Sequence, residues 1–158
     1  MAALACSLVG DVLLMLPRDL FVPGLSAFLT GHVLFIVGLL HPSDRSPTSF
    51  SPVGLVVAAS VVVALEIGPG IVLFRSLVRK GYAKLVGPVA AYMAAIGTLV
   101  VLATNVAIPS AAVGAMLFLV SDTVLALDRF VRPVPRGQLV VHVTYHLAQG
   151  LLVLSLLR

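Results

Sequence analysis

Long apolar runs follow one another along almost the whole chain, separated by short polar or proline- and glycine-rich breaks. A helix that crosses a membrane needs about 20 mostly apolar residues. By that rule the pattern predicts six spanning helices, over residues 1–16, 23–40, 52–67, 86–104, 109–130 and 138–157. A shorter apolar segment, 71–80, follows Gly68-Pro69-Gly70, which we interpret as a helix break. Its length fits an interfacial, re-entrant or tilted short helix.

The composition agrees with a membrane bundle and narrows the class of protein. Of the 158 residues, 60% are hydrophobic and 10% charged, against roughly 25% charged in an average soluble domain. We therefore expect residues 1–158 to form one all-α domain, a polytopic transmembrane helix bundle, in the plasma (inner) membrane if the host is bacterial. The single cysteine, Cys6, excludes an intrachain disulfide and any CxxC motif. The abrupt apolar start predicts that further sequence precedes residue 1.

The positive charge is concentrated in short loops. The net charge is +4, yet Lys and Arg cluster within 75–84 and 129–136, a pattern typical of cytoplasmic loops rather than of a nucleic-acid surface. The short segment 71–80 decides how the first helices point. If it crosses the membrane, Arg45 lies inside and Arg18 outside. If it does not, the two exchange, and charge alone leaves both arrangements open.

Acidic residues lie within the apolar runs. Asp122 is deep in its run, and an acid at membrane depth is costly and marks function by default. Asp11 lies nearer the end of the first run, so the two acids reach the same depth only if the first helix runs inward. That arrangement favours the short segment not crossing. Glu66 precedes the predicted break and is expected at a helix end, where solvation is cheap. Hydrogen bonding for packing specificity is the alternative role of a buried acid.

Further hydrogen-bonding side chains in the apolar runs are candidates for orienting the acids or holding water. Taken singly, such a side chain is more often a contact between helices than a catalytic group. They are His32, Tyr92, Ser121, Tyr145 and Gln149. Tyr145 and Gln149 are four residues apart and share one helix face.

A histidine pair indicates a second kind of site. His142 and His146 are four residues apart, the spacing at which two helix-borne imidazoles bind one zinc ion. His32 or Asp122 would complete the ligand set. Two histidines alone are a weak signal, so a zinc site is kept as an alternative.

Five stretches of the chain, taken in order, resemble the YhhN family of membrane proteins, whose characterised vertebrate members are lysoplasmalogenases. They are SLVGDVLLMLP at 7–17, GLSAFLTGHVLFIVGL at 24–39, PVAAYMAAI at 88–96, GAMLFLVSDTVLALDRF at 114–130 and TYHLAQGLLV at 144–153. Family members usually begin with one more helix, so the resemblance implies an eight-helix architecture whose first helix this chain lacks. The family commonly has an aromatic residue after Tyr145, where this chain has His146. That departure argues against a zinc role shared across the family.

The resemblance implies an enzyme that hydrolyses the vinyl ether bond of lysoplasmalogen-type lysophospholipids to a fatty aldehyde and a glycerophospho-base. The hard step is protonation of the alkene carbon, and two carboxyl groups suit it, one protonated as general acid and one ionised. We expect Asp11 and Asp122 to be this catalytic pair, while Arg129 or Arg132 meets the substrate phosphate. We expect a lysophospholipid and membrane lipids as partners, and no nucleic acid, cofactor or metal.

Two other functions are open from the sequence. Buried acids also serve small transporters and lipid-binding bundles, where they relay protons or hold a cation. The chain has no internal repeat of the kind that many transporters have, which argues against transport. The second alternative is a zinc-dependent intramembrane lipid hydrolase that uses His142 and His146. The oligomeric state is open in every case.

Overall fold

The computed structural model describes residues 1–41, 51–106 and 108–157, and every regular element in them is helical. The elements are α1 (Ala2–Met15), α2 (Phe21–Leu40), α3 (Pro52–Arg79), the short 3₁₀ helix η1 (Ala83–Leu85), α4 (Val86–Asn105), α5 (Pro109–Phe130) and α6 (Gly137–Leu156). Five of them, with η1 and α4 taken together, are long and apolar enough to cross a membrane, and α1 is a shorter apolar helix. The predicted all-α, multi-pass membrane bundle is confirmed.

The first helix is shorter than predicted. It has 14 residues and ends at Met15, because Leu16 is extended (φ −66°, ψ 146°), as expected for a residue that precedes a proline. The predicted first span therefore falls short of the length that crosses a membrane in one straight pass.

The predicted break at Gly68-Pro69-Gly70 is wrong. Residues 52–67 and 71–80 belong to one helix, α3, which has 28 residues and contains Pro69 in its interior. Proline removes one backbone hydrogen bond, but helices in membranes tolerate it because neighbouring groups and small local adjustments satisfy the freed carbonyl. At 1.5 Å per residue α3 is about 42 Å long, more than the roughly 30 Å of hydrocarbon that it must cross.

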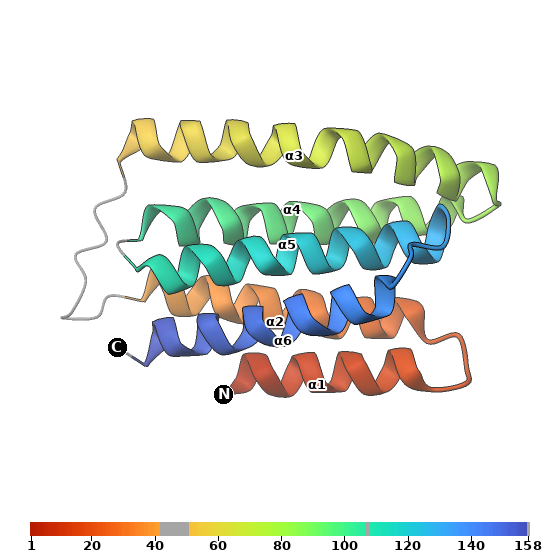
Figure 1. The fold of residues 1–158 in the computed structure, drawn as a ribbon, viewed down its shortest axis with the longest axis horizontal. Helices are drawn as coiled ribbons and strands as arrows, with labels where there is room; N and C mark the ends of the chain where they lie inside the picture. Colours follow the sequence, from red (N-terminus) through yellow and green to blue (C-terminus); the bar gives the residue numbers. More distant parts are fainter. Residues whose placement is uncertain (42–50, 107, 158) are drawn as a thin grey trace.

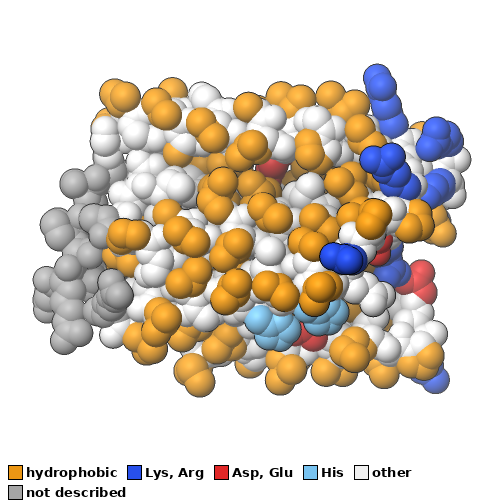
Figure 2. Space-filling model, viewed as in Figure 1, with side chains coloured by type: hydrophobic (Ala, Val, Ile, Leu, Met, Phe, Trp, Pro, Cys, Tyr) orange, Lys and Arg blue, Asp and Glu red, His pale blue; other side chains and the backbone are white. Residues whose placement is uncertain are grey.

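Successive helices run antiparallel, so their connections alternate between the two ends of the bundle (Figure 1). The α1–α2, α3–α4 and α5–α6 connections share one end, and both chain termini lie toward the other. Lys and Arg gather at the end with these three connections (Figure 2). Of the ten such residues, Arg45 and Arg158 lie outside the described residues, and the other eight are at this basic end. By the positive-inside rule we infer that it faces the cytoplasm, so α1 runs inward, as a shared acid site requires.

Small residues bring α5 and α6 into close contact. Ala111, Ala115 and Ala148 are fully buried, and a side chain at Gly114 would lie 3.1 Å from the carbonyl oxygen of Ala148. Such small residues let helix backbones approach each other within a membrane. The close contact fixes Tyr145, one turn before Ala148 in the chain, against the centre of the bundle.

Candidate functional site

A cavity of about 570 Å³ lies in the basic half of the bundle and is lined by residues of all six α-helices. Most of its wall is apolar. The acidic groups that line it are Asp11 from α1, Glu66 from α3, and Asp122 and Asp128 from α5. The two aspartates singled out in the sequence therefore share one cavity, although they are 111 positions apart in the chain.

Asp122 is enclosed by side chains of α2 and α4. The Tyr92 hydroxyl donates a hydrogen bond to Asp122 Oδ2 at 2.6 Å, and His32 Nε2 lies 3.9 Å from the same oxygen. Only 16% of the Asp122 side chain and 2% of the His32 side chain are exposed. His32 Nδ1 is 2.8 Å from the Phe28 carbonyl oxygen, which can only accept, so Nδ1 carries the proton. In a neutral ring the lone pair of Nε2 then faces Asp122.

Asp11 lies in a more open setting at the periphery of the bundle. Its Oδ2 accepts a hydrogen bond from the Tyr145 hydroxyl at 2.8 Å, and its side chain is half-buried. His142 and His146 lie on the exposed side of α6 and line the same cavity as Asp11. Histidine side chains lie beside an acidic one on the face of the bundle in Figure 2. Asp11 therefore lies beside exposed side chains of α6, whereas Asp122 lies beside the buried His32.

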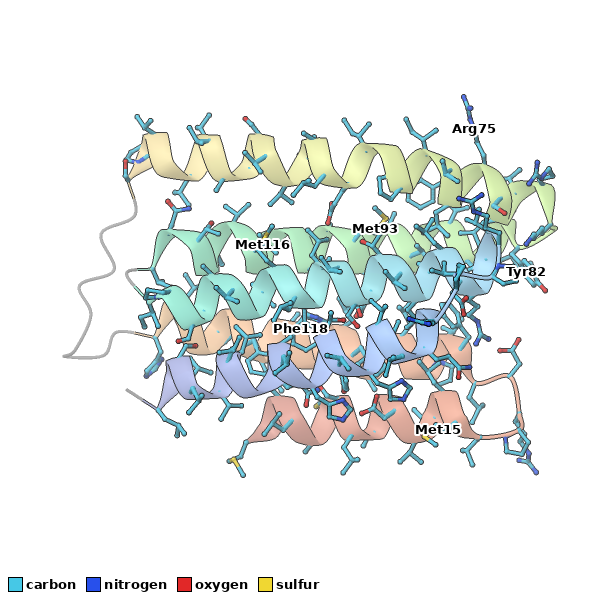
Figure 3. The ribbon with its side chains drawn as sticks, viewed as in Figure 1. Met15, Arg75, Tyr82, Met93, Met116 and Phe118 are labelled. Carbon is cyan, nitrogen blue, oxygen red and sulfur yellow. The ribbon has the colours of Figure 1, made fainter. Side chains whose placement is uncertain are left out.

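A chain of aromatic contacts joins the two acid sites. Phe118, which Figure 3 places in the interior between α5 and α6, makes edge-on contacts with Tyr145 (ring centroids 5.6 Å apart) and His32 (4.8 Å). The His32 ring in turn meets Tyr92 edge-on, at 5.3 Å. Such contacts are favourable and directional. They hold the two tyrosine hydroxyls, and with them the two carboxyl groups, in a fixed relation.

The remaining predicted site residues divide between the cavity and its surroundings. Ser121 lines the cavity and donates a hydrogen bond to the Val141 carbonyl at 3.3 Å, which ties α5 to α6. Arg129 lines the basic end of the cavity and pairs with Asp19. Gln149 is not part of the cavity wall, and its buried Nε2 has no hydrogen-bond partner among the described residues.

The predicted zinc ligands do not form a ligand set. His142 and His146 are nearly parallel, with ring centroids 6.3 Å apart, and each directs Nδ1 to a backbone carbonyl of its own helix. His32 and Asp122, proposed to complete the set, face each other elsewhere in the bundle. Within residues 1–41, 51–106 and 108–157 no group of three or more His, Cys, Asp or Glu is arranged to hold a metal ion.

Glu66 also lines the cavity. Its predicted position at a helix end is wrong. It is in the middle of α3, its buried Oε1 has no hydrogen-bond partner in the described residues, and a side chain at Gly97 would lie 3.3 Å from that oxygen. The error follows from the predicted break at residues 68–70, which placed Glu66 close to the membrane surface. Reading 52–79 as one apolar helix would have identified Glu66 as an acid at membrane depth.

The fold and the cavity define a class: a multi-pass helical membrane protein with an interior cavity that carries several carboxyl groups. The chain belongs to the YhhN family, whose family model matches residues 1–156, as the sequence resemblance predicted.

Two of the relatives that the chain resembles are named lysoplasmalogenases. Human lysoplasmalogenase TMEM86B is 39% identical over 160 residues, which cover 99% of this chain and 62% of the human protein. Lysoplasmalogenase from Mycobacterium tuberculosis is 35% identical over 133 residues, or 82% of this chain and 49% of the relative. The chain thus spans about three fifths of the length of the human protein. No solved structure matches the chain.

Proposed function

We propose that this protein hydrolyses the vinyl ether bond of lysoplasmalogen-type lysophospholipids, releasing a fatty aldehyde and a glycerophospho-base. The observation that carries the proposal is that Asp11 and Asp122, each hydrogen-bonded to a tyrosine, line one cavity within the bundle. The names of the relatives agree with it. The cavity volume, about 570 Å³, falls in the roughly 300–1,000 Å³ range of small-molecule sites, and its apolar wall suits an alkyl chain.

Asp122 is the general acid of this proposal. Its enclosed position next to the buried His32 favours a neutral carboxylic acid, because a charge without full solvation is costly there. The Asp122 proton goes to the alkene carbon that does not carry the ether oxygen, and the electrons of the C=C bond form the new C–H bond. The product of this step is an oxocarbenium ion facing an Asp122 carboxylate.

Asp11 is the ionised partner. Its carboxylate stabilises the oxocarbenium ion and accepts a proton from the water molecule whose oxygen adds to the cationic carbon, giving a hemiacetal. We propose that this water enters from the basic end of the cavity, whose lining includes Arg129 and Gln138.

The hemiacetal then collapses with the two acids in exchanged roles. The Asp122 carboxylate takes the hydroxyl proton of the hemiacetal, the bond to the glycerol oxygen breaks, and Asp11 returns its proton to that oxygen. Fatty aldehyde and glycerophospho-base leave, one water molecule has been consumed, and both carboxyl groups are back in their starting states. Tyr92 and Tyr145 orient the two carboxyl groups through the cycle by donating one hydrogen bond to each.

The test compares three lysophospholipids that differ only at the linkage to the chain. Purified protein in lipid nanodiscs is incubated with the vinyl ether, with the saturated ether and with the ester, and aldehyde and free fatty acid are measured. The proposal predicts aldehyde from the vinyl ether alone, since only this linkage forms an oxocarbenium ion on carbon protonation. Release of fatty acid from the ester without aldehyde from the vinyl ether would make the protein a lysophospholipase instead.

A further inference from the structure

A second, smaller cavity adjoins the acid-lined one at the basic end. It has a volume of about 240 Å³ and lies between the end of α1, the α1–α2 turn and the end of α5. Its charged residues are Arg18, Asp19 and Arg129. Leu14, Phe21 and Arg129 line both cavities, so the two are separated by no more than these side chains.

Arg129 is held at this junction by three contacts. Its guanidinium group donates a hydrogen bond to Asp19 Oδ1 at 3.0 Å, and it lies 4.7 Å from the centroid of the Phe21 ring and 5.6 Å from that of the Phe130 ring. The ion pair is open to solvent, with 40% of Arg129 and 78% of Asp19 exposed. An exposed ion pair contributes little to stability, so folding alone does not account for this arrangement. The Phe21 and Phe130 rings hold the guanidinium group in place. Most of the five N–H donors of Arg129 are left for a ligand.

The small cavity carries both signs of charge and so complements a zwitterionic ligand, with arginines for its anionic group and an aspartate for its cationic group. Arg18 and Arg129 both line the cavity, and arginine suits a phosphate because it binds phosphate oxygens with two parallel hydrogen bonds. The Asp19 carboxylate beside them suits a cationic amine. Both kinds of charge line one cavity at the inferred cytoplasmic surface.

The position of the small cavity fits a lipid that occupies both spaces. Leu14, in the shared wall, is three residues after Asp11, which places the small cavity about one helical turn, roughly 5 Å, beyond the catalytic carboxyl along α1. A lysophospholipid has the same order, with its headgroup a few bonds from the linkage to its chain.

We propose that the small cavity is the headgroup subsite and that it selects a zwitterionic headgroup, with Arg18 and Arg129 on the phosphate and Asp19 on the ammonium group. This inference rests on the proposed function for the identity of the ligand as a lysophospholipid. It adds a binding site and a preference among headgroups to the hydrolysis of the vinyl ether.

The experiment measures binding of lipids that the protein does not cleave. Three saturated ether lipids with the same chain are compared, carrying phosphocholine, phosphate alone or no phosphate, and dissociation constants are measured by native mass spectrometry. The variants are Arg129→Gln and Asp19→Asn. Arg132→Gln is the matched control, because Arg132, the other residue that the sequence offered for the phosphate, is three residues further on and lies outside the linings of both cavities.

The expected pattern is specific to each charge. The wild type binds the phosphocholine lipid at least about tenfold more tightly than the lipid without phosphate, a preference that charge-assisted hydrogen bonds readily supply. Arg129→Gln loses this preference and Arg132→Gln keeps it. Asp19→Asn loses only the advantage of phosphocholine over phosphate alone. Equal binding of the three lipids by the wild type, or equal losses in the two arginine variants, would overturn the proposal.

A competition separates a lipid site from a site for a soluble headgroup. Free glycerophosphocholine should displace the phosphocholine lipid only at concentrations well above those of the lipid itself, and equal potency would overturn the lipid subsite. Because none of these ligands has a vinyl ether, the result does not depend on catalysis. Absence of aldehyde release would refute the proposed hydrolysis and leave the headgroup preference as measured.

Discussion

The two halves of the acid-lined cavity contain the same chemical pair in different surroundings. In the inner pair, Asp122 and Tyr92, the carboxyl is on α5, is 16% exposed and faces a buried histidine. In the outer pair, Asp11 and Tyr145, the carboxyl is on the short helix α1, is half-buried and lies near two exposed histidines. A carboxyl group accepting one tyrosine hydrogen bond is common to both, and what distinguishes them is the neighbouring histidines, buried beside Asp122 and exposed beside Asp11.

This difference is the basis for assigning the two roles. A carboxyl group enclosed among aromatic rings is suited to deliver a proton, whereas one nearer the outside of the bundle is suited to accept a proton from water. The predictions below test the assignment, beginning with the change of largest expected effect.

Asp122→Asn should have the largest effect on catalysis. Asparagine has nearly the same shape but carries no acidic proton, so kcat for aldehyde release should fall by about 10³-fold or more, within the range of general acid catalysis. A steady-state assay with a vinyl ether lysophospholipid measures it. Unaltered elution of the variant in size-exclusion chromatography shows that the fold is intact, and a kcat equal to that of the wild type would remove Asp122 from the mechanism.

Asp11→Asn should have the second largest effect on kcat. In the proposed mechanism the outer acid acts on water and on the cation rather than in the first proton transfer, so kcat should fall by about 10²-fold, the lower end of the same range. The same assay checks this prediction. A loss much greater than that of Asp122→Asn would reverse the assignment of roles.

Removal of each tyrosine hydroxyl should have a smaller effect. Tyr92→Phe and Tyr145→Phe each delete one hydrogen bond to a carboxyl group, and a bond of this kind contributes about 1–3 kcal/mol, or roughly fivefold to 150-fold in rate. The ratio of the two losses compares the inner and the outer pair directly. If neither variant changes kcat, the tyrosines do not orient the acids.

Gly10→Ala should have a modest effect that reaches the outer pair through packing. A Cβ atom at Gly10 would lie 2.7 Å from the Phe28 ring, and that ring contacts Tyr145 edge-on at 5.9 Å. Overpacking of this kind costs about 1–3 kcal/mol of stability, and we expect kcat to fall severalfold as Phe28 displaces Tyr145. Gly68→Ala is the matched control, because nothing lies within 4 Å of its added Cβ. Equal activity of the two variants would exclude this coupling.

Glu66→Gln tests whether a cavity carboxyl group without a tyrosine partner contributes to catalysis. Glu66 lines the same cavity from α3 but has no hydrogen-bonded tyrosine among the described residues. We expect a loss far below the about 10²-fold expected for the outer aspartate. A fall in kcat as large as that of Asp122→Asn would show that the two tyrosine-paired aspartates are not the only carboxyl groups that catalysis needs.

The sequence predicted the parts of this molecule that depend on local pattern. The apolar runs predicted five of the six helix positions within a few residues, because hydropathy over about 20 residues is what membrane insertion selects. Asp11 and Asp122 were candidates because a charged side chain in an apolar run is costly. The family resemblance, which the family model confirms, was read from five short stretches, two of which contain these aspartates.

What the sequence did not predict depends on how helices contact each other. A Gly-Pro-Gly segment is a strong turn signal in water, but in α3 the helix continues through it, and Glu66 was misplaced as a result. The pairing of Asp122 with Tyr92, and of Asp11 with Tyr145, joins residues 30 and 134 positions apart. Only the packing of the bundle determines such partners. The small cavity with Arg18, Asp19 and Arg129 likewise joins one loop to the end of a distant helix.

The central claim is that Asp122 delivers a proton to carbon, and a single turnover in D₂O tests it most directly. Excess protein is mixed with a vinyl ether lysophospholipid, the aldehyde is reduced as it forms, and mass spectrometry counts deuterium on the carbon next to the former aldehyde carbon. The account predicts one deuterium at that carbon for the wild type, formed about 10³-fold more slowly by Asp122→Asn. Aldehyde without deuterium at that position, or equal single-turnover rates for the two proteins, would contradict it.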